Sequence, residues 1–390
     1  MRRNAVHIGD ALTLARGMAD ESTHCIVTSP PYWGLRSYLD DDDPAKAHEM
    51  GAEPTLAEYV AGMVELFREL RRVLRRDGVC WLNLGDCYAG TGKTGGGAQG
   101  TRAEQYRATA ANGKGTWEPP RAAGLKPKDL CLVPYRVAMA LQADGWCLRS
   151  HIIWHKPNPM PESVRDRPTS SHEAVFLLTK SPRYWYDADA IREGAAYPND
   201  NRGARTDNRR GTECNSISGR TGTTRNKRNV WTIATRPYSG SHYAVMPPAL
   251  VEPCILAGCP AKACAECGAG WVRVVERTRM IVRPGPKDIK SQNRTATNGA
   301  MTQAPSTRTL GFRPSCECDA GTAPGLVLDP FMGSGTVGMV AEQHGRDWIG
   351  FDLDERNAAL VTERTKARTV GEALAKREPG ALPGQGGLFG

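Results

Sequence analysis

The sequence predicts an α/β fold built on a doubly wound, mainly parallel sheet. Three observations favour this class: short β-branched runs typical of buried strands, amphipathic stretches typical of helices, and the alternation of the two along the chain. The chain has 390 residues, of which 40% are hydrophobic. It is therefore long enough to form a large domain with insertions.

The expected elements follow in order. An apolar stretch leads to Gly9-Asp10, and residues 25–28 form a compact run that Pro30 and Pro31 end, because proline cannot continue a ladder. The next helix is predicted to end near Gly78, from apolar residues at helical spacing: Leu56, Tyr59, Val60, Met63, Phe67, Leu70 and Leu74. Further strands are expected at 79–84, 151–154, 174–178, 326–329 and 347–352, and further helices at 133–144 and 337–344.

Three stretches interrupt this alternation. Residues 89–128 are rich in glycine and predict a mobile loop, residues 195–230 are rich in arginine, and residues 257–322 carry clustered cysteines. We therefore expect six segments: a catalytic half (1–190), a basic recognition segment (191–236), a closing segment (237–256), a cysteine-cluster insertion (257–322), a second half (323–370) and a flexible tail (371–390).

Charge and cysteine usage limit the class of protein. The formal net charge is +9, as expected for a protein that neutralises phosphates, although a merely basic protein is an equal alternative on charge alone. No run of 18 apolar residues and no apolar leader is present, so we expect no membrane span and a cytoplasmic location. Without an export signal, the 12 cysteines are expected to be reduced, with some available to a metal.

A glycine-rich turn follows the strand that ends at Asp329. Glycines in Gly333-Ser334-Gly335 let the backbone approach a ligand, and the helix that follows supplies free N–H groups at its N-terminus. Asp352 ends the next strand, 23 positions after Asp329, which suits a carboxylate that grips ribose hydroxyls. The full dinucleotide fingerprint is absent, and the turn alone would also suit an ordinary strand–turn–helix.

A second motif, Thr28-Ser29-Pro30-Pro31-Tyr32-Trp33, follows the strand at 25–28. Alone it would more often be a Pro-Pro turn with packed aromatic residues. In a doubly wound sheet, however, loops some 300 residues apart can meet where the strand order reverses. The two motifs together therefore predict one composite site.

In this order, the two motifs resemble the catalytic and cofactor loops of the amino-group DNA methyltransferases of the β group. The resemblance implies a Rossmann-like, S-adenosylmethionine-dependent methyltransferase fold and methyl transfer to an exocyclic amine of a DNA base. It assigns the catalytic loop to Ser29, Pro30, Pro31 and Tyr32. It assigns cofactor contacts to Asp10, His242, Asp329, Pro330, Phe331, Gly333, Ser334, Gly335, Thr336 and Asp352. Stretches around residues 81–86, 154–159, 172–176 and 241–247 also resemble this family.

Such a reaction needs hydrogen-bond acceptors, because the amine lone pair is delocalised into the base. Ser29 Oγ and the Pro30 carbonyl can hold the two amine protons. The target base must leave the duplex, and Tyr32 offers an aromatic face on which it can stack, with Trp33 lining the same pocket.

The choice of base depends on the first residue of the catalytic loop. Ser29 resembles members that methylate cytosine N4, whereas Asp at this place is more typical of adenine N6, which stays the alternative. Methylation at cytosine C5 is excluded, because it needs a cysteine nucleophile and the Pro253-Cys254 pair is followed by Ile255 instead of the Gln of that family.

Four cysteines have the pattern of a metal site. Cys264-x-x-Cys267 and Cys316-x-Cys318 can supply four thiolates for a structural zinc ion, with Gly268 suited to a tight turn. The 48 residues between the pairs exceed usual ribbon spacing, so unpaired reduced cysteines stay an alternative, as does Cys259 as a substitute ligand.

The expected partner is double-stranded DNA, which the basic segment would contact through phosphates and base edges. Residues 385–389 loosely resemble peptides that bind bacterial sliding clamps, although a frayed terminus is the commoner explanation. Two other classes stay open: a non-catalytic zinc-ribbon DNA-binding protein and an RNA amino-methyltransferase.

Overall fold

A computed structural model describes residues 1–34, 39, 42–89, 124–194, 224–235, 245–277, 281–282, 301–303 and 307–369. Most of the expected glycine-rich loop and of the arginine-rich segment, His242 and the tail from residue 371 lie outside these residues. Among the described helices, none is long and apolar enough to cross a membrane.

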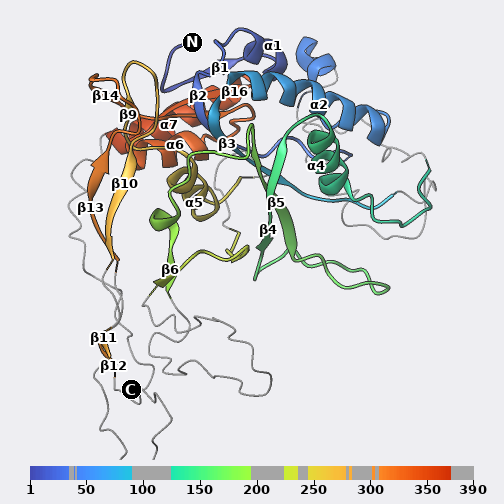
Figure 1. The fold of residues 1–390 in the computed structure, drawn as a ribbon. Coiled ribbons are helices and arrows are strands. Elements are labelled where there is room, and N and C mark those ends of the chain that lie inside the picture. The colour runs from blue at the N-terminus through green and yellow to red at the C-terminus, as the bar shows by residue number, and fades with distance from the viewer. Residues whose placement is uncertain are drawn as a thin grey trace, which may run out of the picture.

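The body of the molecule is one eight-stranded sheet (Figure 1). Its spatial order is β1 (Ala5–Ile8), β16 (Asp347–Asp352), β15 (Leu326–Asp329), β2 (Thr23–Thr28), β3 (Leu74–Leu84), β5 (His172–Thr179), β4 (Cys147–His155) and β8 (Val230–Thr232). All neighbouring pairs are parallel except those that β5 makes with β3 and β4. The predicted mainly parallel sheet is confirmed, with β5 as its reversed strand.

Helices cover both faces of the sheet, as the doubly wound prediction requires. One face is covered by α1 (Ala11–Arg16), α2 (Leu56–Val73) and α4 (Val133–Ala143), and the other by α5 (Pro248–Gly258), α6 (Thr336–Gln343) and α7 (Arg356–Thr369). Side chains alternate between the two cores along a strand. On β2, Ile26 packs with the first set of helices, while Cys25 and Val27 pack with the second.

The remaining elements are short and lie outside the main sheet. They are η1 (Pro44–His48), η2 (Ala188–Ile191), β6 (Glu193–Gly194), β7 (Thr224–Arg225), β9 (Ala263–Cys264), β10 (Val272–Arg277), β11 (Ile281–Val282), β12 (Met301–Gln303), β13 (Thr307–Arg313) and β14 (Thr322–Ala323). In contrast, Val230–Thr232, from the expected recognition segment, joins the main sheet beside β4, and Trp231 is buried there.

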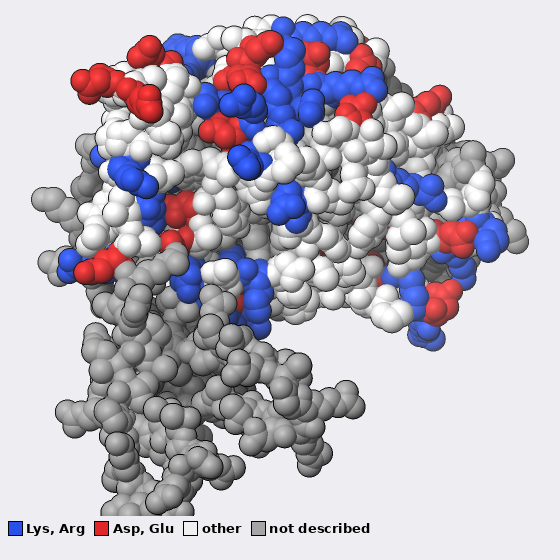
Figure 2. Space-filling model, in the orientation of Figure 1, with Lys and Arg blue, Asp and Glu red and all other residues white. Residues whose placement is uncertain are grey.

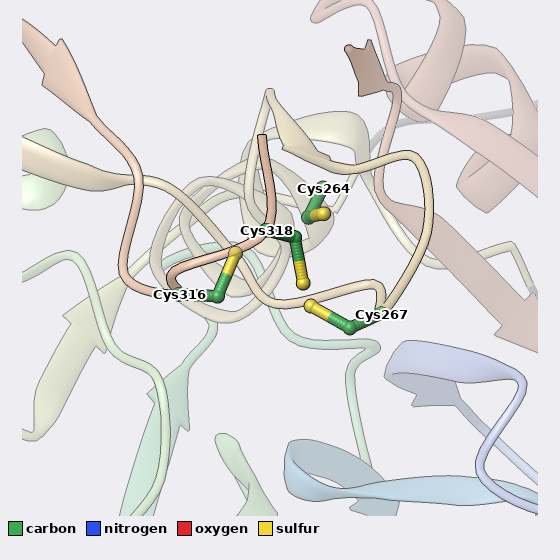
Figure 3. Close-up of side chains that lie close together, drawn as sticks. All are labelled: Cys264, Cys267, Cys316 and Cys318. Carbon is green, nitrogen blue, oxygen red and sulfur yellow. The ribbon is translucent and has the colours of Figure 1, made fainter. Parts of the chain in front are cut away.

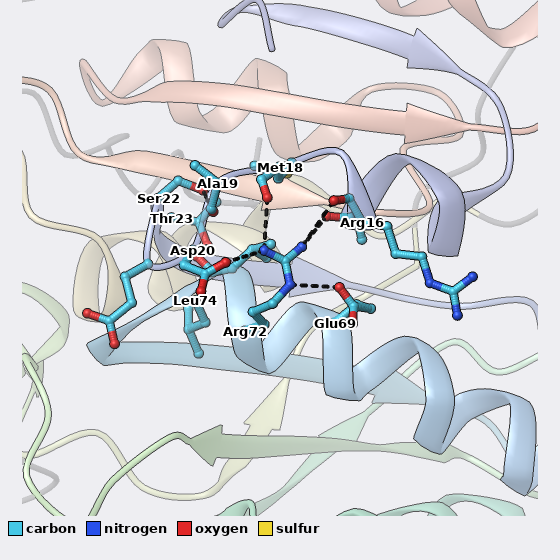
Figure 4. A network of polar contacts seen from close by, with 12 residues as sticks. Arg16, Met18, Ala19, Asp20, Ser22, Thr23, Glu69, Arg72 and Leu74 are labelled. Atoms are coloured by element: carbon cyan, nitrogen blue, oxygen red, sulfur yellow. Dashed lines mark hydrogen bonds and ion pairs between the residues drawn. The ribbon is translucent and has the colours of Figure 1, made fainter.

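Local signals explain how α2 is fixed. Thr55 and Glu58 form a capping box at its start. Near its end, Arg72 donates to the backbone carbonyls of Ala15 and Met18, each at 2.9 Å, and pairs with Glu69 at 2.8 Å (Figure 4). This network holds the turn after α1 against α2, at the sheet edge where β2 begins.

The order of the strands locates the crevice of the fold. From β2 the chain moves to β3 on one side, whereas from β15 it moves to β16 on the other. The strand order therefore reverses between β2 and β15, and ligands of open α/β sheets bind outside the carboxyl ends of the strands at such a point.

Candidate active site

The two predicted loops meet at the reversal point. Thr28, the last residue of β2, donates from Oγ1 to Asp329 Oδ1 at 2.9 Å, and Asp329 is the last residue of β15. Both side chains are buried, and the backbone N–H of Phe331 donates to the same carboxylate oxygen at 3.0 Å. The geometry thus joins the Ser29 loop to the glycine-rich loop across 301 residues of sequence.

Burial dominates the electrostatics of Asp329. It raises the pKa of this carboxyl to about 7, although the hydrogen bonds from Phe331 and Thr28 act in the opposite direction. Near neutral pH, Asp329 is therefore poised between its neutral and charged forms.

Beyond Thr28, the side chains of the Ser29 loop enter a chain of hydrogen bonds. Ser29 Oγ donates to the Tyr32 hydroxyl at 3.3 Å, and Asn83 Nδ2 donates to the same oxygen at 2.6 Å. The Tyr32 hydroxyl in turn donates to Glu173 Oε2 at 2.8 Å, and Lys156 pairs with the other Glu173 oxygen. The five residues come from the ends of β2, β3, β4 and β5, which share one edge of the sheet.

The direction of these bonds follows from the chemistry of each group. A carboxylate paired with Lys156 can only accept, so the Tyr32 hydroxyl donates its single proton to Glu173. Burial, with the Glu173 charge second, holds the pKa of Tyr32 well above its usual range, so that proton is retained. The Tyr32 oxygen then accepts from Asn83 and Ser29, which leaves the lone pairs of Ser29 Oγ free to accept other donors.

The ring of Tyr32 lies against the backbone just after β3. A Cβ at Gly85 would come 2.5 Å from Tyr32 Cε2, so a residue without a side chain is required there. The Pro31 carbonyl accepts from the buried Tyr59 hydroxyl at 2.9 Å, which fixes the Pro-Pro backbone on α2. The expectation for Trp33 is wrong: it is 2% exposed and donates to the Glu53 carbonyl, so it packs in the core instead of lining the site.

The glycine-rich loop is held by Asp352 at the end of β16. Gly333 N–H donates to Asp352 Oδ2 at 2.7 Å, while Asp354 N–H and Asn357 Nδ2 donate to Oδ1. Gly335 has φ +78°, and a Cβ on it would lie 3.1 Å from Val361, so glycine is needed where the loop enters α6. A carboxylate has about four acceptor positions. Asp352 therefore keeps room for a further donor beside these loop contacts.

Three other predicted cofactor residues make contacts within the protein. The Ser334 and Thr336 hydroxyls accept from the Arg364 guanidinium at 2.7 and 3.1 Å, which ties the loop to α7. Asp10 follows β1 and caps α1, where Oδ2 accepts from the Thr13 N–H at 2.8 Å.

The Asp10 cap also lies beside Asp352, because Gly9 N–H donates to the Asp352 carbonyl at 2.8 Å. The edge thus combines carboxylate acceptors with the half-buried ring of Phe331 and the buried Pro330. This set of hydrogen-bond acceptors and apolar side chains fits a ligand that carries ribose hydroxyls and an apolar chain.

Sequence reasoning missed the roles of Asn83, Lys156 and Glu173. All three lie in stretches noted for family resemblance, but nothing in those stretches indicates that they converge on Tyr32. Asn83 and Lys156 lie at the carboxyl ends of their strands, the edge that carries Ser29, and this is the signal that could have found them. Glu173 lies at the start of its strand and reaches this edge only because β5 is antiparallel. The four predicted metal ligands lie elsewhere, beside the residues that begin β2, β3 and β15.

Comparisons with known proteins point to one family. A model of the DNA methylase family N6_N4_Mtase matches residues 23–263 and 320–363. The chain is 36% identical over 371 residues to the type II methyltransferase M.SmaI of Serratia marcescens, which covers 94% of this chain and 92% of the relative. It is also 36% identical to the type II methyltransferase M.Cfr9I of Citrobacter freundii, over 91% of this chain and 85% of that one.

Solved structures give a more distant likeness. A PvuII DNA methyltransferase described as cytosine-N4-specific matches with a TM-score of 0.49 and 16% identity, over 92% of this chain and 85% of the other. A putative DNA modification methylase of Thermus thermophilus in complex with S-adenosylmethionine matches with a TM-score of 0.46 and 18% identity, over 94% and 95%.

Proposed function

The chain belongs to the DNA methylase family, and within it we propose that this protein methylates the exocyclic N4 of cytosine at specific sites in double-stranded DNA. S-adenosylmethionine is the methyl donor. The observation that carries the proposal is the Thr28–Asp329 hydrogen bond, because it brings the acceptors of the Ser29 loop beside the glycine-rich loop. Positioning of this kind is the main contribution that a protein can make to a direct displacement.

The methyl donor supplies a methyl group bonded to a positively charged sulfur. The Asp352 carboxylate is proposed to bind the ribose hydroxyls of the donor, and the Asp10 carboxylate its adenine. The other residues proposed to hold the donor lie in and around the glycine-rich loop: Asp329, Pro330, Phe331, Gly333, Ser334, Gly335 and Thr336. Since the Ser334 and Thr336 hydroxyls already bind Arg364, their part is to shape the loop and not to hydrogen-bond the ligand through those hydroxyls. The proposed contact from His242 lies outside the described residues.

The catalytic loop is proposed to act on the target amine. Ser29 Oγ donates its own hydrogen bond to Tyr32, so its lone pairs can accept a hydrogen bond from one amine N–H. The Pro30 carbonyl can accept a hydrogen bond from the other. Holding both protons draws the nitrogen toward a tetrahedral shape and directs its lone pair at the methyl carbon. Forming the N–C bond would break the methyl–sulfur bond, with the electron pair left on sulfur, and the methylated amine would then release one proton to solvent. Ser29 Oγ and the Pro30 carbonyl would accept hydrogen bonds from the amine during this step without taking up the proton.

The chain from Ser29 through Tyr32 to Glu173 is proposed to keep Ser29 in this accepting state. Lys156 pairs with Glu173, Glu173 accepts a hydrogen bond from the Tyr32 hydroxyl, and the Tyr32 oxygen accepts one from Ser29 Oγ. Glu173 and Lys156 are thus positioning residues that act through Tyr32. Stacking of a flipped base on the Tyr32 ring stays a prediction.

Contact with the duplex is proposed to involve the arginine-rich segment between β6 and β7. On the face shown in Figure 2, basic and acidic side chains are interspersed over the upper part of the molecule. Two of the arginines of α2 form ion pairs, Arg68 with Asp144 and Arg72 with Glu69. Ion pairs of this kind reduce the positive charge that these side chains offer to phosphates.

We propose cytosine as the target base and not adenine, because Ser29 at the start of the catalytic loop resembles family members that methylate cytosine N4. The test is nucleoside mass spectrometry on plasmid DNA from cells that express the protein, with Ser29→Ala as the matched variant. We expect N4-methylcytosine from the wild type and its loss in the variant. N6-methyladenine in its place would keep the mechanism and overturn the base, while no methylated base would overturn the proposed function.

A further inference from the structure

The cysteines of the inserted segment converge from two distant parts of the chain. Sγ atoms of Cys264, Cys267, Cys316 and Cys318 all lie within 4.8 Å of one another, and Figure 3 shows them gathered at one place. Four thiolates arranged tetrahedrally at a Zn–S distance of about 2.3 Å would be about 3.8 Å apart. A small contraction of this cluster therefore gives the geometry of a zinc tetrathiolate site. We propose that these four cysteines bind one structural Zn²⁺ ion.

The loop that carries the first two cysteines has the backbone of a metal knuckle. Gly268 N–H donates to the Cys264 carbonyl at 3.0 Å, and Cys264 N–H donates to the Ala269 carbonyl at 2.9 Å. Gly268 has φ +69°, and a Cβ there would come 2.5 Å from Arg75 Nη1, so the turn requires glycine. The second pair of cysteines is brought close because β14 pairs with β9, with Thr322 opposite Cys264.

The four clustered cysteines differ from nearby Cys259 in their location, and three of them also in their exposure. Cys259, the alternative ligand, packs in the core beside α5 and is not part of the group of four cysteines whose Sγ atoms lie together. In contrast, Cys267 is exposed, and Cys316 and Cys318 are half-buried, so hydrophobic packing does not account for them. With four protein ligands, a bound ion has no open position for a water, which makes its role structural.

Contacts from the knuckle reach the start of three central strands. The backbone N–H of Leu326 donates to His24 Nδ1 at 3.0 Å, so Nε2 carries the proton and donates to the Gly268 carbonyl at 2.8 Å. Arg75 Nη1 donates to the Cys267 carbonyl at 2.9 Å. These residues lie at the beginning of β2, β15 and β3, whereas Ser29 and Asp329 follow or end the first two of these strands.

The ion would therefore fix the inserted segment at the sheet edge opposite the reacting groups. It would also brace the base of the β10–β13 hairpin, where Ser315 Oγ donates to the Gly270 carbonyl at 2.7 Å. Metal binding energy at such a site is folding energy, because the ligands come together only in the folded state.

The test uses the full chain purified under reducing conditions without chelator. We expect about one zinc per chain by elemental analysis. Exchange with Co²⁺ should give the absorption bands of a tetrahedral cobalt thiolate, and zinc removal should lower the Tm. The variant Cys267→Ser/Cys318→Ser should contain no zinc. Cys147→Ser, a half-buried cysteine on β4, is the matched control and should keep the ion.

The wild-type measurements decide the proposal even if the double variant fails to fold. A reduced wild-type protein that contains no zinc and gives no cobalt bands overturns it. Disulfides within the cluster under the same reducing conditions, detected by intact mass, also overturn it. The metal measurements do not depend on methyl transfer, so they stand whether or not the proposed function does.

Discussion

The substitution Glu173→Gln tests whether the hydrogen-bond chain sets the state of Ser29. Glutamine keeps the shape of the side chain but loses the charge, and its amide N–H₂ can donate toward the Tyr32 oxygen. The Tyr32 hydroxyl then has no fixed acceptor and can donate its hydrogen bond to Ser29 Oγ instead. Ser29 would use a lone pair for that bond and turn its own O–H away from Tyr32, so it would accept less well from the target amine. Lys156 also loses its partner in a pair whose side chains are only 19% and 16% exposed.

The expected size of the effect follows from the hydrogen bonds that the carboxylate accepts. Glu173 accepts from Tyr32 and from Asn83, each at 2.8 Å, and a hydrogen bond to a charged group contributes a net 1.5–3 kcal/mol, roughly. If one such bond acts in the transition state, the rate of methyl transfer falls by about 10- to 150-fold. The KM for S-adenosylmethionine should stay within about twofold, because Glu173 is proposed to act on the target amine.

The assay is single-turnover transfer of a labelled methyl group to unmethylated plasmid DNA. Glu69→Gln is the matched control, since Glu69 also forms an ion pair, with Arg72, but lies on α2 and outside the hydrogen-bond chain of Ser29. Tyr32→Phe should slow transfer similarly, and the double variant should be no slower than the worse single one, because both break one chain. A Glu173→Gln rate within twofold of wild type, or additive effects in the double variant, would refute the reasoning.

Three further changes test the site. Gly85→Ala places a methyl group 2.5 Å from the Tyr32 ring and should slow transfer, whereas Gly194→Ala, which has no atom within 4 Å of its added Cβ, should not. Thr28→Val removes a buried donor and should cost about 1–3 kcal/mol of unfolding free energy in urea. Between about pH 4 and 7, native Asp329 holds a proton that the unfolded chain has lost, so stability falls as the pH rises, by at most about 1.4 kcal/mol per pH unit. Asp329→Asn should remove this slope, and an unchanged Tm profile between pH 5 and 8 would contradict it.

The sequence is sufficient for elements with a strong local pattern. The strands that end at Thr28, Asp329 and Asp352 are predicted to within two residues at either end, because each is a continuous apolar run closed by a polar residue or proline. The helix from Leu56 is predicted from its one-sided apolar spacing, although it ends at Val73 because the strand after it begins earlier than expected.

Other elements lack such a pattern. The helix Pro248–Gly258 is apolar on nearly all sides and contains Pro253, so it shows no helical period and is not predicted. The reversed direction of β5 cannot be read from a buried run, which looks the same in parallel and antiparallel pairs. Val230–Thr232 is too short, and lies in too basic a stretch, to stand out as a strand.

The parts of the site that form contiguous motifs can be predicted from the sequence, whereas the parts that depend on strand direction cannot. Ser29 and Gly333-Ser334-Gly335 are contiguous motifs, whereas Glu173 matters only because β5 runs backward and presents its first residues at the edge where the other strands end. The catalytic loop can precede the glycine-rich loop in the chain because β2 and β15 are joined by hydrogen bonds and not by a short connection. The site depends on which strand ends lie side by side. The fold accommodates the insertion after α5 because the inserted chain enters β15 at the edge of the sheet opposite the site.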